Sequence, residues 1–367
     1  MRRRRIETHQ RMKALFKPND ISHYRQALMG IGILGVMAIH WCLWDGLQYI
    51  SDGLYNLCKV LVALVFTEGF LFLSGFGLYY SFSRNPDIRS FYHRRIKRLY
   101  LPFFLLSLPL YLFLLITDKE YGIVTFVEQI TTVYFWTHGN YGNGMWYVAV
   151  SLALYFLFPF IYRFLFSNKE TKVILVKGIV LLLLIFSVNV AIAVLNHEYF
   201  QRASLGITKI PMFFLGMLFA YFTKNGELSE KNYLYLIILF AALYLGLSFL
   251  RKYFDFWAGV SMAMVQKMVF MPLICAFLSV LEKIKLGVII KQPLDWFGKY
   301  SLELYLLHLN IYLFLSKCNL FGSITVVWKA TLAMIAAIVL CVPTNKFLSC
   351  LINKKTESVS PGHRETR

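Results

Sequence analysis

Long apolar segments alternate with short polar connections along almost the whole chain. Each apolar segment is about 20 residues long, which is enough for an α-helix to cross the hydrocarbon core of a bilayer. The alternation typical of membrane-spanning β-strands is not visible. The pattern therefore predicts an all-α protein, a polytopic bundle of transmembrane helices. About ten spans are expected, at residues 28–48, 54–82, 99–117, 145–166, 173–195, 205–222, 232–250, 256–281, 297–316 and 325–351.

The composition excludes an ordinary soluble domain. Of the 367 residues, 58% are hydrophobic and 16% are charged, and the mean hydropathy is +0.58. A soluble fold of this length could not bury so much apolar surface. No cleavable signal peptide is expected, because the first 24 residues are polar and contain no apolar segment.

The net charge of +19 would suggest a nucleic-acid partner in a soluble protein. Here the placement of the basic residues favours a topology signal, because 29 of the 38 Lys and Arg residues lie on one side of the predicted spans. We therefore expect both termini to be cytoplasmic and no nucleic acid to bind. The predicted organisation is a basic N-terminal segment (1–24), a transmembrane domain (25–352) and a polar cytoplasmic tail (353–367).

The cysteines give no sign of a metal site or a disulfide framework. None of them falls in a CxxC or CxxH pattern, and most lie in or beside apolar segments, where a thiol behaves as a small hydrophobe. We therefore expect no bound metal. The six residues are Cys42, Cys58, Cys275, Cys318, Cys341 and Cys350.

Two ionisable residues lie inside predicted spans at similar depth. Glu68 is in the apolar stretch FTEGFLFLSGFG, and His40 ends the stretch MGIGILGVMAIH. At about 1.5 Å of rise per residue, both lie roughly 22–24 Å from the cytoplasmic boundary. Glu68 can be a neutral acid that hydrogen-bonds a neighbouring helix, and His40 can be an interfacial residue beside Trp41 and Trp44. The alternative is a catalytic pair in which a carboxylate orients and charges a histidine.

Two further stretches contain both structural and functional candidates. The segment SGFG at 74–77 is explained by close helix packing or a kink. The segment HRRIKRLYLP at 93–102 is sufficiently explained as a topology anchor, yet Arg95 and Arg98 share a helix face and could hold phosphates.

The remaining candidates lie in the fourth and ninth predicted spans. The Gly- and Asn-rich segment HGNYGNGMWYV at 138–148 contains Asn143, Trp146 and Tyr147, and it can be an ordinary turn or a loop that binds sugar hydroxyls. His308, in SLELYLLH at 301–308, lies near the expected midplane of the membrane.

In this order, these stretches resemble the acyltransferase 3 family of integral membrane acyltransferases over about residues 22–350. GIGILGVMAIH is similar to the family's Arg-Gly-Ile-Ala…His, and EGFLFLSGFG to its Gly-Val-Asp-Ile-Phe-Phe-x-x-Ser-Gly-Phe. FYHRRIKRLYLP resembles Phe-Tyr-x-Arg-Arg-x-x-Arg-Ile-x-Pro. GMWYVAVSLALYFLFP and SLELYLLH resemble Trp-Tyr-Leu…Tyr-x-x-Phe-Pro and Ser-x-x-Leu-Tyr-Leu-x-His.

The resemblance implies acyl transfer from acetyl-CoA, bound as a co-substrate, to a hydroxyl group. His40 would be the general base or a transient acyl carrier, and Glu68 would fix its tautomer and stabilise the imidazolium. Arg95 and Arg98 would hold the phosphates of acetyl-CoA at the cytoplasmic face. The family's first-span Arg corresponds to Met29 in this chain, and Arg25 is one turn away on the same helix face as a substitute.

For the acceptor, the resemblance implies a glycan that is exported or displayed on the cell surface. Asn143, Trp146 and Tyr147 would contact its sugar, with the indole stacking on an apolar sugar face. Ser74 and His308 would line the acceptor site or the channel. Many members carry Glu or Gln where this chain has Ser151, so that position supplies no carboxylate here.

Two alternative functions stay open at this point. The fold could transfer a different acyl group, such as succinyl, or act on a lipid or small molecule. It could also be a glycan transporter or export partner, although the internal repeats of a transporter are not clear. In each case we expect a multi-pass protein of the plasma (inner) membrane that works beside glycan biosynthesis or export proteins.

Overall fold

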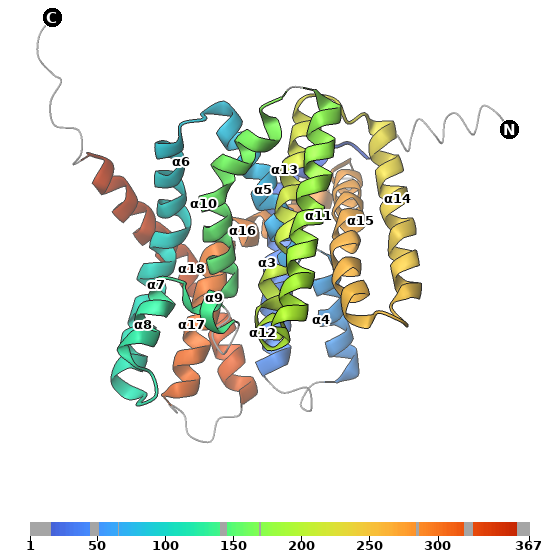
Figure 1. Ribbon diagram of the computed structural model, residues 1–367. Coiled ribbons are helices and arrows are strands. Elements are labelled where there is room, and N and C mark those ends of the chain that lie inside the picture. The colour runs from blue at the N-terminus through green and yellow to red at the C-terminus, as the bar shows by residue number, and fades with distance from the viewer. Residues whose placement is uncertain are drawn as a thin grey trace, which may run out of the picture.

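The computed structural model describes residues 16–44, 51–64, 66–139, 145–168, 170–283, 286–318 and 326–357 (Figure 1). In these ranges the regular elements are helices, as the hydrophobic pattern predicts, and no strand occurs. The elements are α2 (Asp20–His23), α3 (Arg25–Trp44), α4 (Asp52–Leu64), α5 (Phe66–Arg84), α6 (Ile88–Arg95), the π-helical segment η2 (Ile96–Tyr100), α7 (Leu101–Thr117), α8 (Ile123–Ile130), α9 (Tyr134–His138), α10 (Trp146–Phe166), α11 (Thr171–Leu195), α12 (His197–Ile207), α13 (Ile210–Lys224), α14 (Glu230–Leu250), α15 (Asp255–Lys283), α16 (Leu286–Lys299), α17 (Ser301–Lys317) and α18 (Val326–Glu357).

The helices are long and apolar enough for a multi-pass membrane protein. Within the described ranges, 8 helical segments meet both requirements for crossing a bilayer. α5 and α17 are not among them, because α5 includes Glu68 with several Ser and Gly residues, and α17 has 17 residues. The expected count of about ten spans and the cytoplasmic termini therefore stay predictions. The last helix, α18, continues to Glu357, inside the predicted tail.

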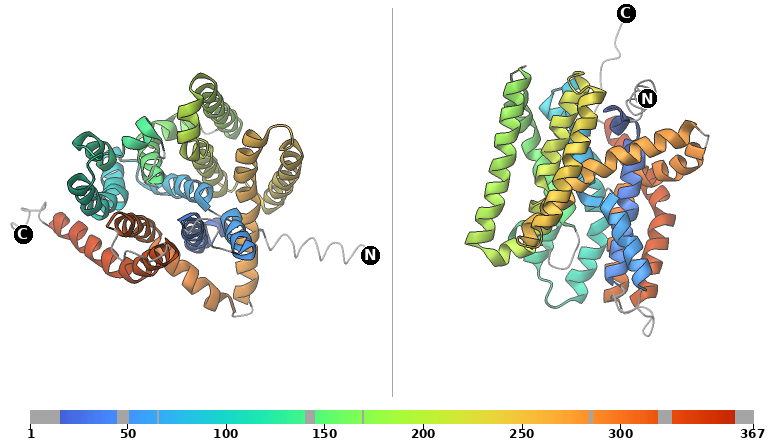
Figure 2. Two further views of the ribbon diagram at one scale, coloured as in Figure 1. Left: turned by 90° about the horizontal axis from the view of Figure 1, so that it is seen from below. Right: turned by 90° about the vertical axis from the view of Figure 1, so that its right-hand side faces the viewer.

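The outer helices present apolar side chains to their surroundings. On α11, Leu183 and Leu184 are 61% and 58% exposed, and on α14 Leu239 is 53% exposed. Such surfaces are unfavourable in water and favourable against lipid tails. α11 and α14 lie at the periphery of the bundle (Figures 1 and 2), so this periphery is the lipid-facing side.

Glycine lets α5 pack against α13 with backbone in contact. A Cβ atom built on Gly75 would lie 2.0 Å from the carbonyl oxygen of Phe213, and one built on Gly216 would lie 2.1 Å from that of Phe72. Only a residue without a side chain permits this approach, which is typical of helix packing in membranes. The packing interpretation of the SGFG segment is therefore confirmed at Gly75.

Glycine also allows backbone contact between α3 and α16. A Cβ atom on Gly30 would lie 1.9 Å from the carbonyl oxygen of Leu294, and one on Gly298 would lie 2.0 Å from that of Gln26. Gly30 lies in the stretch MGIGILGVMAIH of the first predicted span. α3 therefore packs closely on α16 and also contacts α5, which fixes the position of its polar residues.

The third predicted span starts earlier than residue 99. Asp87 caps α6, where its carboxylate accepts a hydrogen bond from the Ser90 backbone N–H at 2.7 Å, and the helix then continues through η2 into α7. The hydropathy pattern does not predict this part of the helix, because Arg94, Arg95, Lys97 and Arg98 interrupt the apolar sequence. The π-helical segment widens the turn at Arg98 and changes the direction of the side chains around it.

The two ends of the bundle contain different helices and different polar residues. α6 and the start of α3 lie at the upper end in Figure 1, whereas α8, α9 and the end of α3 lie at the lower end. The basic cluster of α6 and η2 therefore belongs to the upper end. His40, on the last turns of α3, belongs to the lower half of the bundle.

Candidate active site

The two histidines that the sequence predicts on separate spans form one pair. His40 Nδ1, from α3, lies 2.9 Å from His308 Nε2, from α17. The rings are stacked, with centroids 5.2 Å apart. The His308 side chain has no exposed surface. The structure therefore brings together two predicted site residues that the sequence had treated as separate candidates.

The hydrogen bonds of this pair determine which ring nitrogens carry hydrogen. His308 Nδ1 lies 2.6 Å from the backbone carbonyl oxygen of Leu304, which can only accept, so this nitrogen is the donor. In a neutral ring the other nitrogen, His308 Nε2, is then an acceptor, and His40 Nδ1 must donate to it. His40 Nε2 is left with a free lone pair. This is the atom of the pair that can take a proton.

Aromatic rings hold the His40 imidazole from the side. Trp44 stacks on His40 with centroids 5.4 Å apart and on Tyr312 with centroids 3.7 Å apart. Trp41 Nε1 donates to Thr331 Oγ1 at 3.0 Å, which ties α3 to α18. The end of α3 is therefore fixed by contacts to two other helices.

A cavity of about 190 Å³ lies between α3, α5, η2, α10 and α17. On α3 it is lined by Met29, Ile33 and Val36. These positions continue at helical spacing to His40, so the imidazole lies on the same helix face one turn beyond Val36. Tyr305 lines the cavity from α17, again one turn before His308. The cavity thus leads towards the histidine pair.

The other end of this cavity is basic. Arg95 and Arg98 line it, and Arg98 also lines a wider hollow of about 640 Å³ together with Arg25, Lys97 and Lys299. A third hollow, of about 450 Å³, shares Arg25 and Arg94 with the wider one. It is further lined by Ser22, Phe76, Gly77, Tyr80, Ser81, Arg84 and Asn85. The predicted donor-site residues are therefore assembled at one place, where cationic side chains surround an open space.

Arg25, which the sequence offers as a substitute for the family's first-span arginine, reaches across to α5. Its Nε donates to the backbone carbonyl oxygen of Leu73 at 3.3 Å. Gly77 makes room for the guanidinium, because a Cβ atom there would lie 3.0 Å from Arg25 Nη2. The side chain thus crosses from α3 to α5 and separates the two larger hollows.

Glu68 is not in contact with His40. Its carboxylate pairs with Lys209, whose Nζ lies 3.0 Å from Glu68 Oε1. Thr67 Oγ1 donates to Glu68 Oε2 at 3.4 Å and accepts from Lys209 Nζ at 2.8 Å. The carboxylate is only 4% exposed. Because Lys209 occupies it, the predicted orienting role of Glu68 towards His40 stays a prediction, and His308 holds the place beside His40.

The predicted acceptor residues have different surroundings. Tyr147 lines the cavity, and Trp146 is buried with Lys209 Nζ 5.3 Å from its ring centroid. Ser74 Oγ lies 3.1 Å from the hydroxyl of Tyr155, which lines the same cavity. Asn143 lies outside the described residues. Ser74 and Tyr147 are therefore near the cavity, and Trp146 packs beside the Glu68 pair.

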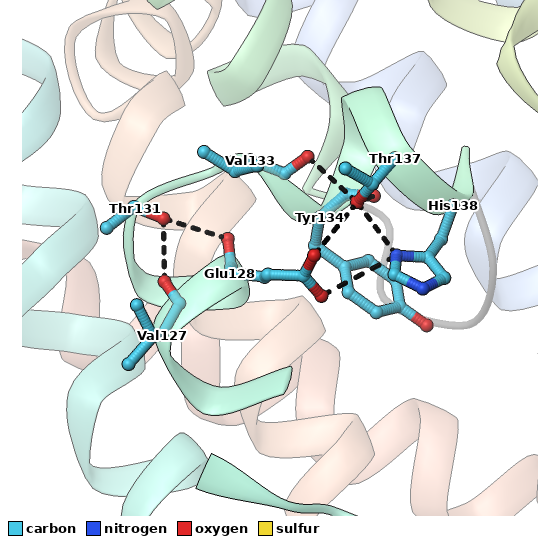
Figure 3. Close-up of polar contacts among 7 residues, drawn as sticks. All are labelled: Val127, Glu128, Thr131, Val133, Tyr134, Thr137 and His138. Atoms are coloured by element: carbon cyan, nitrogen blue, oxygen red, sulfur yellow. Dashed lines mark hydrogen bonds and ion pairs between the residues drawn. The ribbon is translucent and has the colours of Figure 1, made fainter. Parts of the chain in front are cut away.

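A separate polar cluster lies at the lower end of the bundle, on α8 and α9 (Figure 3). His138 Nδ1 is 2.8 Å from Thr137 Oγ1 and 3.6 Å from Glu128 Oε2. The imidazole also stacks on Tyr134, with centroids 4.5 Å apart. These contacts fold the polar connection after α7 into two short helices.

A comparison with protein-family models finds a match over residues 26–346 to the acyltransferase domain of the acyltransferase 3 family. The chain belongs to the acyltransferase 3 family. The match includes both histidines, the basic cluster and the Glu68 pair. No curated protein and no solved structure matches the chain. As a member of the acyltransferase 3 family, the protein is a multi-pass membrane acyltransferase.

Several residues that line these cavities or act on the Glu68 carboxylate were missing from the sequence-based candidates. They are Arg94, Lys97, Tyr155, Lys209, Lys267 and Tyr305. Lys209 and Lys267 carried a usable signal, because an ammonium inside an apolar span marks a functional or paired position. Tyr155 and Tyr305 gave no such signal, because with 23 tyrosines and 33 phenylalanines in the chain a single aromatic residue does not stand out.

Proposed function

We propose that the protein transfers an acetyl group from acetyl-CoA to a hydroxyl of a glycan that is exported or displayed on the cell surface, in the plasma membrane. The observation that carries this proposal is the free Nε2 of His40, one helical turn beyond Val36, which lines a cavity together with Arg95 and Arg98. The glycan acceptor rests on the family resemblance. The acetyl group likewise rests on the family resemblance.

The donor would bind with its phosphates among the basic residues at the upper end, which we expect to face the cytoplasm. Coenzyme A carries a diphosphate and a further phosphate, and guanidinium groups bind such anions with paired hydrogen bonds. Arg25, Arg94 and Arg98 border the larger hollow. The extended pantetheine arm would then pass Tyr147 and Tyr305 in the apolar cavity and bring the thioester towards His40.

The reaction would proceed by general-base catalysis. The acceptor oxygen attacks the thioester carbonyl carbon, and its proton moves to His40 Nε2. The C–S bond breaks, the coenzyme A thiolate leaves, and the imidazolium returns the proton to it. His308 accepts from His40 Nδ1 throughout, so it holds the tautomer that exposes the Nε2 lone pair. In this scheme, His308 has the positioning role that the sequence assigned to Glu68.

The test is turnover by the purified full chain in detergent. Wild type is expected to release free coenzyme A from acetyl-CoA, whereas His40→Ala is expected to bind acetyl-CoA with unchanged affinity and not to turn it over. His197→Ala is the matched control, because this histidine is exposed on α12 outside the cavity. The proposal fails if wild type neither binds nor consumes acetyl-CoA, or if His40→Ala is as active as His197→Ala.

A further inference from the structure

Lys267 adds a second positive charge beside the Glu68–Lys209 pair, which has a single carboxylate. Lys267, on α15, is 2% exposed, and its charge acts on both Glu68 and Lys209. Its hydrogen bond is to the neutral Gln266 Oε1 at 3.4 Å. Among the described residues no carboxylate oxygen lies within 4.0 Å of its ammonium. Two buried cations therefore share one anion.

Such an arrangement is costly inside a membrane. An ammonium removed from water loses several kcal/mol of hydration free energy, and only a nearby anion in good geometry compensates for this loss. Lys209 already has Glu68 at 3.0 Å and the Trp146 ring at 5.3 Å. Lys267 has neither. The position thus favours a further anion that is not part of the described chain.

The cluster borders the place of the reaction. Thr67, which accepts a hydrogen bond from Lys209, lines the cavity that leads to His40. Lys209 itself lies in the turn between α12 and α13, beside Trp146. A small anionic group that lies beside Thr67 in this cavity would be near Lys209, whose Nζ is 2.8 Å from Thr67 Oγ1, and Lys267 is close enough for its charge to act on Lys209. Among substrate anions, a carboxylate is compact enough to share such a site with Thr67 and matches an ammonium as a charge-assisted hydrogen-bond partner.

We propose that Lys209 and Lys267 bind a carboxylate of one of the two substrates. This rests on the proposed acyl transfer from coenzyme A to a hydroxyl and names the substrate class of the same site; a carboxylate on the acyl group would replace the acetyl group of that proposal. The carboxylate belongs either to an acidic sugar of the acceptor or to a dicarboxylic acyl group on coenzyme A. In both cases it is the substrate that completes the balance of charge around Glu68.

The experiment compares matched probes that differ by one carboxylate. Dissociation constants of acetyl-CoA and succinyl-CoA are measured on the full chain in detergent, and glucuronate is compared with glucose as an inhibitor of acetyl-CoA consumption. One probe with the carboxylate is expected to bind about tenfold better than its neutral partner, as a charge-assisted hydrogen bond predicts. A preference for succinyl-CoA assigns the carboxylate to the acyl group, and a preference for glucuronate assigns it to the acceptor.

The variants connect the preference to the lysines. Lys267→Met is expected to abolish the tenfold ratio, and Lys267→Arg, which keeps the charge, to retain a preference. Lys283→Met is the matched control, because this lysine is exposed at the end of the same helix. Equal affinities in wild type overturn the proposal even if Lys267→Met does not fold, and so does a preference that survives in Lys267→Met. Acetyl-CoA consumption by wild type tests the proposed function independently of these ratios.

Discussion

The contact between α5 and α13 gives a sharp test of how the bundle is built. In Gly75→Ala, the new Cβ atom would lie 2.0 Å from the carbonyl oxygen of Phe213. Ordinary contacts of this kind begin at about 3.4 Å, so the two helices must separate by more than 1 Å. Overpacking of a tight interface costs about 1–3 kcal/mol, and the contact involves backbone, which yields less readily than a side chain.

The matched control is Gly246→Ala on α14. No atom lies within 4 Å of a Cβ built there, so alanine is expected to stabilise the helix by about 0.5–1 kcal/mol. Thermal unfolding in detergent, followed by tryptophan fluorescence, compares the two variants with wild type. We expect a lower midpoint for Gly75→Ala and an equal or higher one for Gly246→Ala. A Gly75→Ala protein as stable as Gly246→Ala would refute the close packing of α5 on α13.

Three further predictions address the charges. Arg98→Met should raise the KM for acetyl-CoA about tenfold or more, since it removes a charge-assisted contact to phosphate, and steady-state kinetics measures this. Glu68→Gln leaves the buried Lys209 ammonium without its carboxylate and should cost about 3–5 kcal/mol of unfolding free energy. The double variant with Lys209→Met should recover much of this loss. No recovery in a double-mutant cycle would contradict the pairing. The hydrogen bond from Lys317, at 2.8 Å, and then the one from the Glu120 backbone N–H lower the pKa of Asp118. Asp118 therefore stabilises the fold above the ordinary carboxyl pKa of 3.8, and this stability is lost as the pH falls further. Lys317→Met should weaken that acid dependence in a Tm–pH profile, and an unchanged profile would contradict the contact.

Most of the fold follows from the hydrophobic pattern. The helices α3, α7, α10, α11 and α14 lie where long apolar segments predict them, because burial in lipid leaves a helix as the only way to satisfy the backbone. The start of α6 was not predicted. Its residues are charged, and the hydropathy pattern cannot distinguish a basic helix from a loop.

The candidate site could be predicted in its residues but only partly in its pairings. His40, His308 and Arg98 were identified from polar positions in apolar segments and from the family motifs. Depth along a helix places residues at a similar height, yet it does not say which helices are neighbours. His40 therefore meets His308 rather than Glu68, since α17 packs on α3 at that height. The partner of Glu68 comes from the turn before α13, which no spacing along the sequence indicates.

The most direct test of the account is the single-turnover rate of acyl transfer in His308→Ala. If His308 holds His40 in the tautomer that exposes Nε2, the rate should fall about 10²-fold or more, as expected for loss of an oriented general base. The affinity for acetyl-CoA should stay unchanged. A His308→Ala protein that transfers the acyl group at the wild-type rate would contradict the histidine pair as the centre of the reaction.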